Sequence, residues 1–336
     1  MRNRLLNSTC AAVLFFAAST RAQTLEGVID LHAHSDPDSV GRSIDAIDLA
    51  KLAKSRGMRG LVLKNHWEST ASVAYLVRKE VPGIEVFGGI VMNLAVGGLN
   101  PVAVERMTMV KGGWGRVVWM PTYDAENHIR DSKENRPFVS VAKNGELVAA
   151  AKDVIAVVAK HNLTLETGHS SPEECLMILR EGKRQGVQHM VVTHALTVPV
   201  RMSIEQMKEA AGLGAFIELV YGRMNAAEYA RAIREVGPEH IILATDLGQP
   251  NLPLHPDGML AFFDALRKQG IAGADIETMS RANLPARLVC PSANLKTRPG
   301  PRSTLPAYIR QAPRPLARGQ FRQLLAERPG PGAPPQ

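Results

Sequence analysis

Several residue types and patterns are scarce in this 336-residue chain, and each scarcity excludes a class of protein. Cysteine occurs three times, with the spacing of neither a disulfide framework nor a structural zinc site. Cys10 lies directly before the short apolar run near the start, and we expect Cys175 and Cys290 to be free thiols, with a disulfide between them as the alternative. Aromatic residues make up only 5% of the sequence, so aliphatic side chains and alanine must build the core, as in parallel sheets covered by helices. No apolar stretch, including the short run near the start, is long enough to cross a membrane.

The first 22 residues follow the order of a secretory signal peptide. Arg2 and Arg4 provide a positive start, an apolar run covers residues 11–18, and small residues lead to a cleavage position after Ala22. The apolar run is too short to serve as a membrane anchor. We therefore predict a signal peptide over residues 1–22 and a periplasmic or secreted protein. The alternatives are a buried first helix and a misassigned start codon.

The segment 291–336 is rich in proline, arginine and glycine, a composition typical of a disordered tail. It carries a net charge of +7 and the leader adds three arginines, so the formal +8 of the whole chain leaves about −2 for the residues between them. The basic isoelectric point is thus a property of the two ends, and it does not indicate a nucleic-acid partner. The predicted folded unit is a single domain over residues 23–290.

Between these ends, short apolar runs alternate with segments typical of helices. Each run has the length and composition of a strand that is buried on both faces. The helical segments carry N-cap residues, first-turn prolines and glycine stops. The predicted strands are Val28–His32, Gly60–Lys64, Ile84–Val91, Arg116–Met120, Leu163–Thr167, His189–Thr193, Ala215–Val220 and Ile241–Thr245. The predicted helices include Ile44–Arg56 capped by Ser43, Thr70–Lys79, Gly145–Lys160, one with a capping box at Ser171, Asp257–Lys268 and Ala274–Leu288.

Eight strands, each followed by a helix, predict an α/β fold of the (β/α)8 TIM-barrel type. An open, doubly wound sheet is the competing architecture, and it would usually place a glycine-rich phosphate loop after the first strand. The first predicted strand ends instead in the sequence His32-Ala33-His34. We therefore favour the closed barrel.

Residues able to bind a metal fall at the carboxyl ends of the predicted strands, where barrel enzymes carry their chemistry. His32 and His34 are two positions apart, so they point to the same side of the strand, with Asp30 beneath them. Imidazole and carboxylate ligands suit zinc and its neighbours, so the pattern predicts a divalent metal, with zinc expected and one or two ions. Later strands end in three further candidates: His169, His194 and Asp246.

The order His-x-His, His, His, Asp on strands one, five, six and eight resembles the amidohydrolase superfamily. Residues 283–288, Asn-Leu-Pro-Ala-Arg-Leu, are similar to a segment near the end of many such domains, and residues 88–100 and 119–122 resemble a poorly characterised bacterial branch. The resemblance covers most of residues 27–289 and implies hydrolysis of an amide, ester, lactone or phosphoester bond of a small molecule. It also implies that Asp246 is both a metal ligand and the acceptor of a proton from the attacking water. The implied histidine ligands are His32, His34, His169 and His194.

The fourth predicted strand departs from the two-metal members of this superfamily. It ends in Trp119-Met120-Pro121-Thr122, without the carboxylated lysine or glutamate that those members usually place there. Lys64 on the second strand is a candidate substitute, and it shares a face with His66. We therefore include Lys64 among the catalytic residues and His66 among the metal ligands. The alternative, which we favour for Lys64, is that it binds an anionic group of the substrate; it could also pair with Asp246 or Asp30.

Other polar residues receive structural interpretations. Glu166 is out of phase with the face that carries His169, so we expect it to face the helices. Glu218 lies in the middle of a strand and is expected to be a buried, hydrogen-bonded acid behind the site. His128 and His255 are interpreted as surface residues of loops, with entry into the site from the loop after the eighth strand as the alternative for His255.

Four loops, over residues 67–70, 97–100, 123–138 and 249–258, are expected to shape the pocket. Arg130 and Arg136 lie in one of them and could hold a substrate carboxylate. The expected partner is a small-molecule substrate, with no nucleic acid and no stable membrane anchor, and a homo-oligomer is left open.

Three other functions stay open at this point. A phosphoesterase of the polymerase-and-histidinol-phosphatase kind also begins with His-x-His, but it has a seven-stranded barrel and more ligands. A metal-dependent decarboxylase of the same superfamily is the second. The third is an exported metal- or ligand-binding protein without catalytic activity, against which Asp246 argues, because a pure binder needs no proton acceptor.

Overall fold

The structure is a computed structural model that describes residues 24–283. The predicted signal peptide, the predicted tail over residues 291–336, Cys290 and most of the motif at residues 283–288 lie outside the described residues. Cys175 is a buried free thiol, as predicted. None of the helices in the described part is long and apolar enough to cross a membrane.

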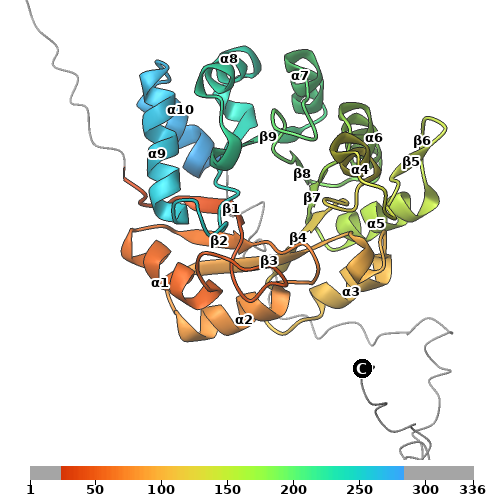
Figure 1. The fold of residues 1–336 in the computed structure, drawn as a ribbon, viewed down its shortest axis with the longest axis horizontal. Helices are drawn as coiled ribbons and strands as arrows, with labels where there is room; N and C mark the ends of the chain where they lie inside the picture. Colours follow the sequence, from red (N-terminus) through yellow and green to blue (C-terminus); the bar gives the residue numbers. More distant parts are fainter. Residues whose placement is uncertain (1–23, 284–336) are drawn as a thin grey trace, which may run out of the picture. The chain divides into compact units, whose positions relative to one another are not determined.

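Eight parallel strands form one sheet in the order β1-β2-β3-β4-β7-β8-β9-β10. Its two edges meet where Ala33 and Leu247 form an isolated parallel bridge and the amide of Asp246 donates to the carbonyl of His32 at 2.9 Å. The helices surround this ring of strands (Figure 1). The predicted eight-stranded barrel is confirmed, and the seven-stranded alternative is wrong. The strands are β1 (Ile29–Ala33), β2 (Gly60–Leu63), β3 (Glu85–Val91), β4 (Gly115–Trp119), β7 (Thr164–Glu166), β8 (His189–Val192), β9 (Ala215–Val220) and β10 (Ile241–Ala244).

Every connection between neighbouring barrel strands contains a helix, which is what parallel pairing requires. The helices are α1 (Ala46–Ser55), α2 (Ala71–Glu80), α3 (Pro101–Thr108), α4 (Glu126–Ser132), α5 (Ala149–Lys160), α6 (Pro172–Arg184), α7 (Ile204–Gly212), α8 (Ala226–Val236), α9 (His255–Lys268) and α10 (Gly273–Glu277).

Local sequence explains where several helices begin. Ser171 caps α6 in a capping box with Glu174, as predicted. Asp45 caps α1 by accepting hydrogen bonds from two amides of the first turn, so the prediction of Ser43 as the cap is wrong. The amide of Ser43 instead donates to the carbonyl of Gly248, which ties the β1–α1 loop to the chain after β10.

The segment between β4 and β7 contains more structure than the loop that the sequence predicts. It holds α4 and a short antiparallel pair, β5 (Ala142–Lys143) and β6 (Glu146–Leu147). Asn144 and Gly145 form the turn of this hairpin with φ values of 52° and 79°, the left-handed conformation that an Asn-Gly turn uses. The turn takes the place of the helix start predicted at Gly145.

Apolar side chains pack on both sides of the sheet. The larger cluster lies between the strands and the surrounding helices, while a smaller cluster made of strand residues lies inside the ring. The inner cluster consists of Ile29, Leu31, Val62, Phe87, Val91, Val117, Trp119, Val191, Val220, Ile242 and Ala244. Polar residues follow these side chains along several strands, so the carboxyl end of the barrel carries polar side chains.

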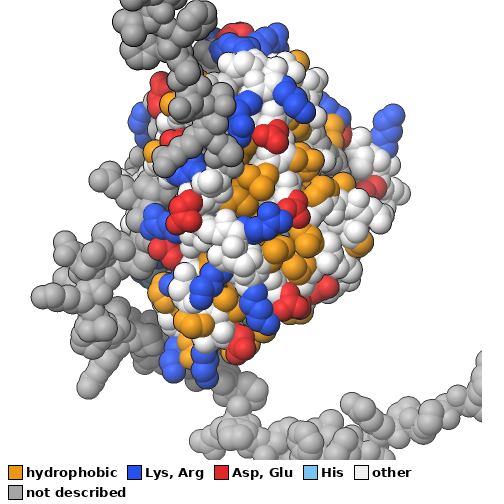
Figure 2. All heavy atoms as spheres, turned by 90° about the vertical axis from the view of Figure 1, so that its left-hand side faces the viewer, with side chains coloured by type: hydrophobic (Ala, Val, Ile, Leu, Met, Phe, Trp, Pro, Cys, Tyr) orange, Lys and Arg blue, Asp and Glu red, His pale blue; other side chains and the backbone are white. Residues whose placement is uncertain are grey.

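The outer surface carries both signs of charge. On the face that Figure 2 shows, lysine and arginine side chains are interspersed with aspartate, glutamate and apolar side chains. This mixture agrees with the small net charge expected for the part of the chain between the ends.

Candidate metal centre

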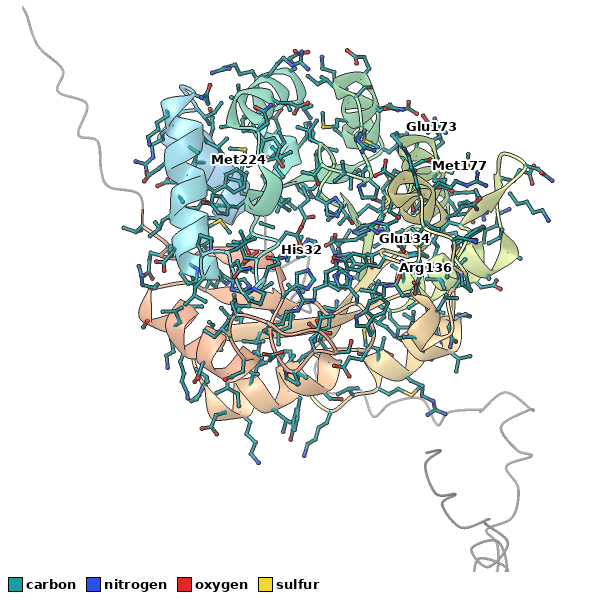
Figure 3. All side chains as sticks on the ribbon, in the orientation of Figure 1. His32, Glu134, Arg136, Glu173, Met177 and Met224 are labelled. Carbon is teal, nitrogen blue, oxygen red and sulfur yellow. The ribbon has the colours of Figure 1, made fainter. Side chains whose placement is uncertain are left out.

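Three predicted ligands meet where β1 and β10 lie next to each other. Oδ1 of Asp246 lies 3.0 Å from Nε2 of His32 and 3.2 Å from Nε2 of His34. Among residues 24–283, these side chains form the one group of three or more His, Cys, Asp or Glu residues whose ligand atoms all lie within 4.8 Å of one another. Figure 3 places His32 among the side chains enclosed by the ring of strands.

The backbone is left-handed at two of the predicted site residues. Asp246 has a φ of 52° and His194 a φ of 27°, and both stand directly after or close to the end of a barrel strand. This conformation costs a residue with a Cβ about 1–2 kcal/mol. The turn at Asp246 brings its carboxylate back toward β1, where 22% of the side chain remains exposed.

Glu218 on β9 holds two parts of the site in place. Both of its carboxylate oxygens lie 3.2 Å from Nδ1 of His32, and Oε2 accepts the amide of His194 at 2.9 Å. A hydrogen on Nδ1 that points to Glu218 leaves the lone pair of Nε2 for a metal. The prediction that Glu218 is a buried, hydrogen-bonded acid behind the site is consistent with these contacts.

The charges buried around the cluster are out of balance. Lys64 adds an amino group to the cluster, and its Nζ lies 2.8 Å from Nε2 of His32. Burial and Lys64 lower the pKa of His32, but Asp246 and Glu218 outweigh them and raise it to about 10. Burial lowers the pKa of Lys64. Since His32 and Lys64 must share one proton across 2.8 Å, the surrounding carboxylates leave this position attractive to a further positive charge.

Glu166 lies inside the barrel, so the prediction that it faces the helices is wrong. Its Oε2 accepts a hydrogen bond from Oγ1 of Thr193 at 2.9 Å, while Leu165 packs outward against Gly182 of α6. Burial, and after it the charge of Glu218, raises the pKa of Glu166 to about 8. The alternation assumed from Leu165 to His169 does not continue, because β7 ends at Glu166.

Gly168 explains how His169 still reaches the site. Its φ is 63°, and a Cβ at this position would lie 2.3 Å from the carbonyl oxygen of Met120. The turn therefore requires glycine, and it brings the amide of His169 to the carbonyl of Pro121 at 2.9 Å.

Most of the histidines of the site are neutral. Burial lowers the pKa of His34 to about 3 and that of His194 to about 4. Burial likewise lowers the pKa values of His66 and His169 well below the usual range. Neutral imidazoles are the form that binds metal ions.

A cavity of about 310 Å³ opens at the carboxyl ends of the strands. Five of the six predicted ligands line it, and the sixth, His32, is fully buried. The ring centroids are 4.8 Å apart for His34 and His66, and 4.9 Å apart for His169 and His194. The cavity is lined by His34, Arg42, Lys64, His66, Tyr123, His128, Asp131, Ser132, His169, His194, Thr197, Val198, Pro199, Gly222, Asp246, Gln249 and Leu252.

The lining corrects the expectation for the loops. Residues 123–138 and 249–258 contribute as predicted, whereas 67–70 and 97–100 do not. Arg136 pairs with Asp124 and Glu134 and does not line the cavity. Arg130 pairs with Glu126, and the arginine that does line the cavity is Arg42, which the sequence did not single out.

Two histidines interpreted as surface residues are not exposed loop residues. His128 lies on α4 and lines the cavity, with Nδ1 3.0 Å from Nδ1 of His169. The spacing of barrel strands could not reveal it, because α4 was not predicted. His255 begins α9 and is fully buried, and this burial lowers its pKa to about 4.

Asp30 is part of the framework rather than the cavity wall. Its carboxylate accepts hydrogen bonds from the amide of His32 at 3.2 Å and from the amide and hydroxyl of Thr245 at 2.9 and 2.5 Å. These contacts link β1 to the end of β10. Asp30 therefore holds together the two strands that carry His32, His34 and Asp246.

The donor atoms fit a divalent metal ion. Two imidazole nitrogens and one carboxylate oxygen form a set that suits zinc, iron, cobalt or nickel. Glu218 provides the partner for the second nitrogen of one imidazole, and the surplus of buried carboxyl groups favours a cation next to His32.

Comparisons with known proteins agree with the fold. Residues 27–218 match the model of a family described as a family of unknown function, DUF6282. No protein of curated function matches the sequence.

Solved structures share the barrel at low sequence identity. An amidohydrolase from Pseudomonas aeruginosa is 14% identical with a TM-score of 0.53, over 78% of this chain and 95% of that one. A variant of organophosphorus hydrolase is 15% identical with a TM-score of 0.54, over 79% and 93%. A 2,6-dihydroxybenzoate decarboxylase is 14% identical with a TM-score of 0.50, over 79% and 98%. These likenesses show the fold, which is the one that the resemblance to amidohydrolases implied.

Proposed function

The chain belongs to the DUF6282 family, whose function is unknown, and from the geometry of the site we propose that it is a metal-dependent hydrolase of the amidohydrolase type. The observation that carries the proposal is the convergence of His32, His34 and Asp246 within 4.8 Å at the carboxyl end of an eight-stranded barrel. Barrel enzymes place their catalytic groups at this end.

In the proposed mechanism, His32, His34 and Asp246 would hold the ion. Such an ion supplies Lewis acidity and lowers the pKa of water toward neutrality. Asp246 accepts the proton of the attacking water, and its low pKa, maintained by His32 and His34, means that it is ionised at neutral pH. Glu218 keeps the proton of His32 on Nδ1.

Lys64 acts on the substrate in this proposal. Its Nζ is buried beside His32 and lines the cavity, so it can donate to an oxygen of the substrate as negative charge develops there. The second interpretation is that Lys64 is carboxylated and bridges two ions. Metal stoichiometry separates the two, because removal of a bridging Lys64 would release part of the metal.

The structurally similar proteins include hydrolases and a decarboxylase, and a hydrolase fits this site better. The reason is Asp246, a carboxylate close to both histidines that can take a proton from water. A screen of esters, lactones, amides and phosphoesters, with carboxylated aromatic acids as the decarboxylation arm, tests this choice. Release of carbon dioxide without hydrolysis of any ester, lactone, amide or phosphoester would contradict it.

Metal analysis of the purified full chain is the direct test of the site. The double variant His32→Ala, His34→Ala should lose the metal while the barrel still folds, because these ligands lie outside the inner apolar cluster. His161→Ala is the matched control, since His161 is partly exposed and pairs with Glu105. Equal metal content in the double variant and the control would refute the site.

We also propose that residues 1–22 direct export, so that the enzyme acts in the periplasm or outside the cell. N-terminal sequencing of protein recovered from the producing cells should then begin at Gln23. Recovery with an intact Met1 from the cytosolic fraction alone would contradict export.

A further inference from the structure

Arg42 presents a fixed donor to the cavity. It lies in the loop between β1 and α1, and only 6% of its side chain is exposed. Asp38 accepts hydrogen bonds from Nε at 2.8 Å and from Nη2 at 2.5 Å, which fixes one edge of the guanidinium group. Within residues 24–283, Nη1 donates to no protein group. A guanidinium group held at one edge, with donors left over, is suited to a planar anion with two oxygens.

The other charged residues of the cavity favour an anion as well. Lys64 adds a second cationic group, although burial lowers its pKa. Of the two aspartates in the lining, Asp131 has its oxygens 2.5 and 3.3 Å from the guanidinium nitrogens of Arg201. The other, Asp246, belongs to the proposed metal ligands. The lining therefore offers donors to a substrate anion and leaves no uncommitted carboxylate for a substrate cation.

Exposed apolar side chains also converge on this cavity. Tyr123, Val198 and Leu252 are 38%, 37% and 39% exposed, and each comes from the loop after a different strand. The ring of Tyr123 is held edge-on against His66, with centroids 4.4 Å apart. Large apolar groups that stay exposed around a cavity indicate a ligand with an apolar surface. A cavity of about 310 Å³ is at the low end for small-molecule sites, so that ligand is compact.

We propose that Arg42 forms an anion subsite and that the cavity accepts a compact carboxylate with an apolar body. The proposal rests on the proposed function only in placing the scissile bond beside His32, His34 and Asp246. Arg42 binds the carboxylate, and Tyr123, Val198 and Leu252 contact the apolar body.

The test measures binding, so it does not depend on knowing the true substrate. Benzoate is compared with benzamide, which has nearly the same shape without the charge, and with phenyl phosphate, by calorimetry on the metal-loaded full chain. Benzoate should bind at least about tenfold more tightly than benzamide, because a charge-assisted hydrogen bond is lost with the charge. Weaker binding of benzoate than of phenyl phosphate would overturn the assignment to a carboxylate.

Arg42→Met should remove the preference for benzoate over benzamide, and Arg42→Lys should keep only part of it, since lysine lacks the planar pair of donors. Arg130→Met is the matched control, because Arg130 also forms an ion pair with an acid four residues away but lies outside the cavity lining. A preference that survives in Arg42→Met would mean that the metal alone binds benzoate, which overturns the subsite. If Arg42→Met does not fold, the same comparison in Arg42→Lys decides.

The two proposals fail in different ways. Protein that binds metal and hydrolyses neutral esters but does not distinguish benzoate from benzamide loses the subsite and keeps the hydrolase assignment. Protein that makes the distinction through Arg42 yet retains no metal loses the hydrolase assignment and keeps the subsite.

Discussion

The same strands build two layers inside the barrel, and the layers differ in what they do to stability. The inner cluster, which includes Ile29, Phe87 and Ile242, is apolar and buried. The polar layer at the strand ends, which includes Lys64 and Glu166, is also buried but consists of ionisable groups. Burial of apolar surface stabilises the fold, whereas burial of charged groups costs free energy unless each is paired. The inner apolar cluster therefore stabilises the barrel, whereas the polar layer provides the groups of the proposed site and lowers the stability of the fold.

The sharpest test of this difference is Asp246→Asn. Activity should fall about 10²–10⁴-fold, because asparagine cannot accept a proton near neutral pH. The fold should survive, since asparagine tolerates the left-handed conformation that residue 246 adopts. Kinetics at equal metal loading, together with a thermal melt, measure both effects. Wild-type turnover at equal loading would show that Asp246 is not the base.

Phe87→Ala tests the inner apolar cluster, where we expect a loss of stability with no loss of metal. Removal of this buried ring should lower the free energy of unfolding by about 3–5 kcal/mol while metal content at low temperature stays unchanged. Denaturant unfolding and metal analysis provide the two measurements. Loss of metal from protein that is still folded would mean that the two layers are not separable.

His255 tests the cost of burying an ionisable group through the pH dependence of the free energy of unfolding. It is buried but does not line the cavity. Burial lowers its pKa to about 4 from an unfolded value of 6.5, so the unfolded chain binds its proton first as the pH falls. The stability contributed by neutral His255 is complete above pH 6.5 and is lost as the pH falls toward 4. The loss approaches about 3 kcal/mol.

In His255→Gln, the free energy of unfolding should fall less steeply over this pH interval than in the wild type. Urea unfolding at a series of pH values measures both slopes in metal-free protein. Parallel curves would show that His255 does not titrate differently in the folded and unfolded states.

Glu218→Gln gives the smallest expected effect. The amide keeps the shape but loses the charge that holds the proton of His32 on Nδ1, so metal affinity should fall about 10–100-fold. Competition with a chelator measures the affinity, and the melting temperature serves as a control for the fold. Unchanged affinity would mean that Glu218 supports only the backbone near His194.

Most of the fold could be predicted because each barrel strand is a short apolar run bounded by polar or glycine residues. The ligand cluster could be predicted for a similar reason, since His32 and His34 are two residues apart on one strand. What could not be predicted depends on departures from ideal geometry. Glu166 faces inward because the regular alternation of β7 does not extend to His169, and the glycine before His169 was the available signal.

Contributions from the loops were the least predictable part of the site. Arg42 reaches the cavity from the loop after β1, which was not among the loops expected to shape the pocket. His128 reaches it from α4, a helix of seven residues that is too short for a clear periodic pattern. Charge and residue type alone pointed to Arg130 and Arg136, whose charges are already paired with local acids.

The left-handed backbone at His194 and Asp246 also bears on how this chain can evolve. Glycine adopts that conformation without steric cost. Replacement of either residue by glycine would therefore relieve as much as about 1–2 kcal/mol of backbone strain, but it would remove the side chain that the proposed chemistry needs. A descendant released from selection for catalysis would be expected to drift toward glycine or asparagine there and to become more stable as it lost activity. Glycine or asparagine at these two positions in a related chain would therefore indicate that the proposed activity has been lost.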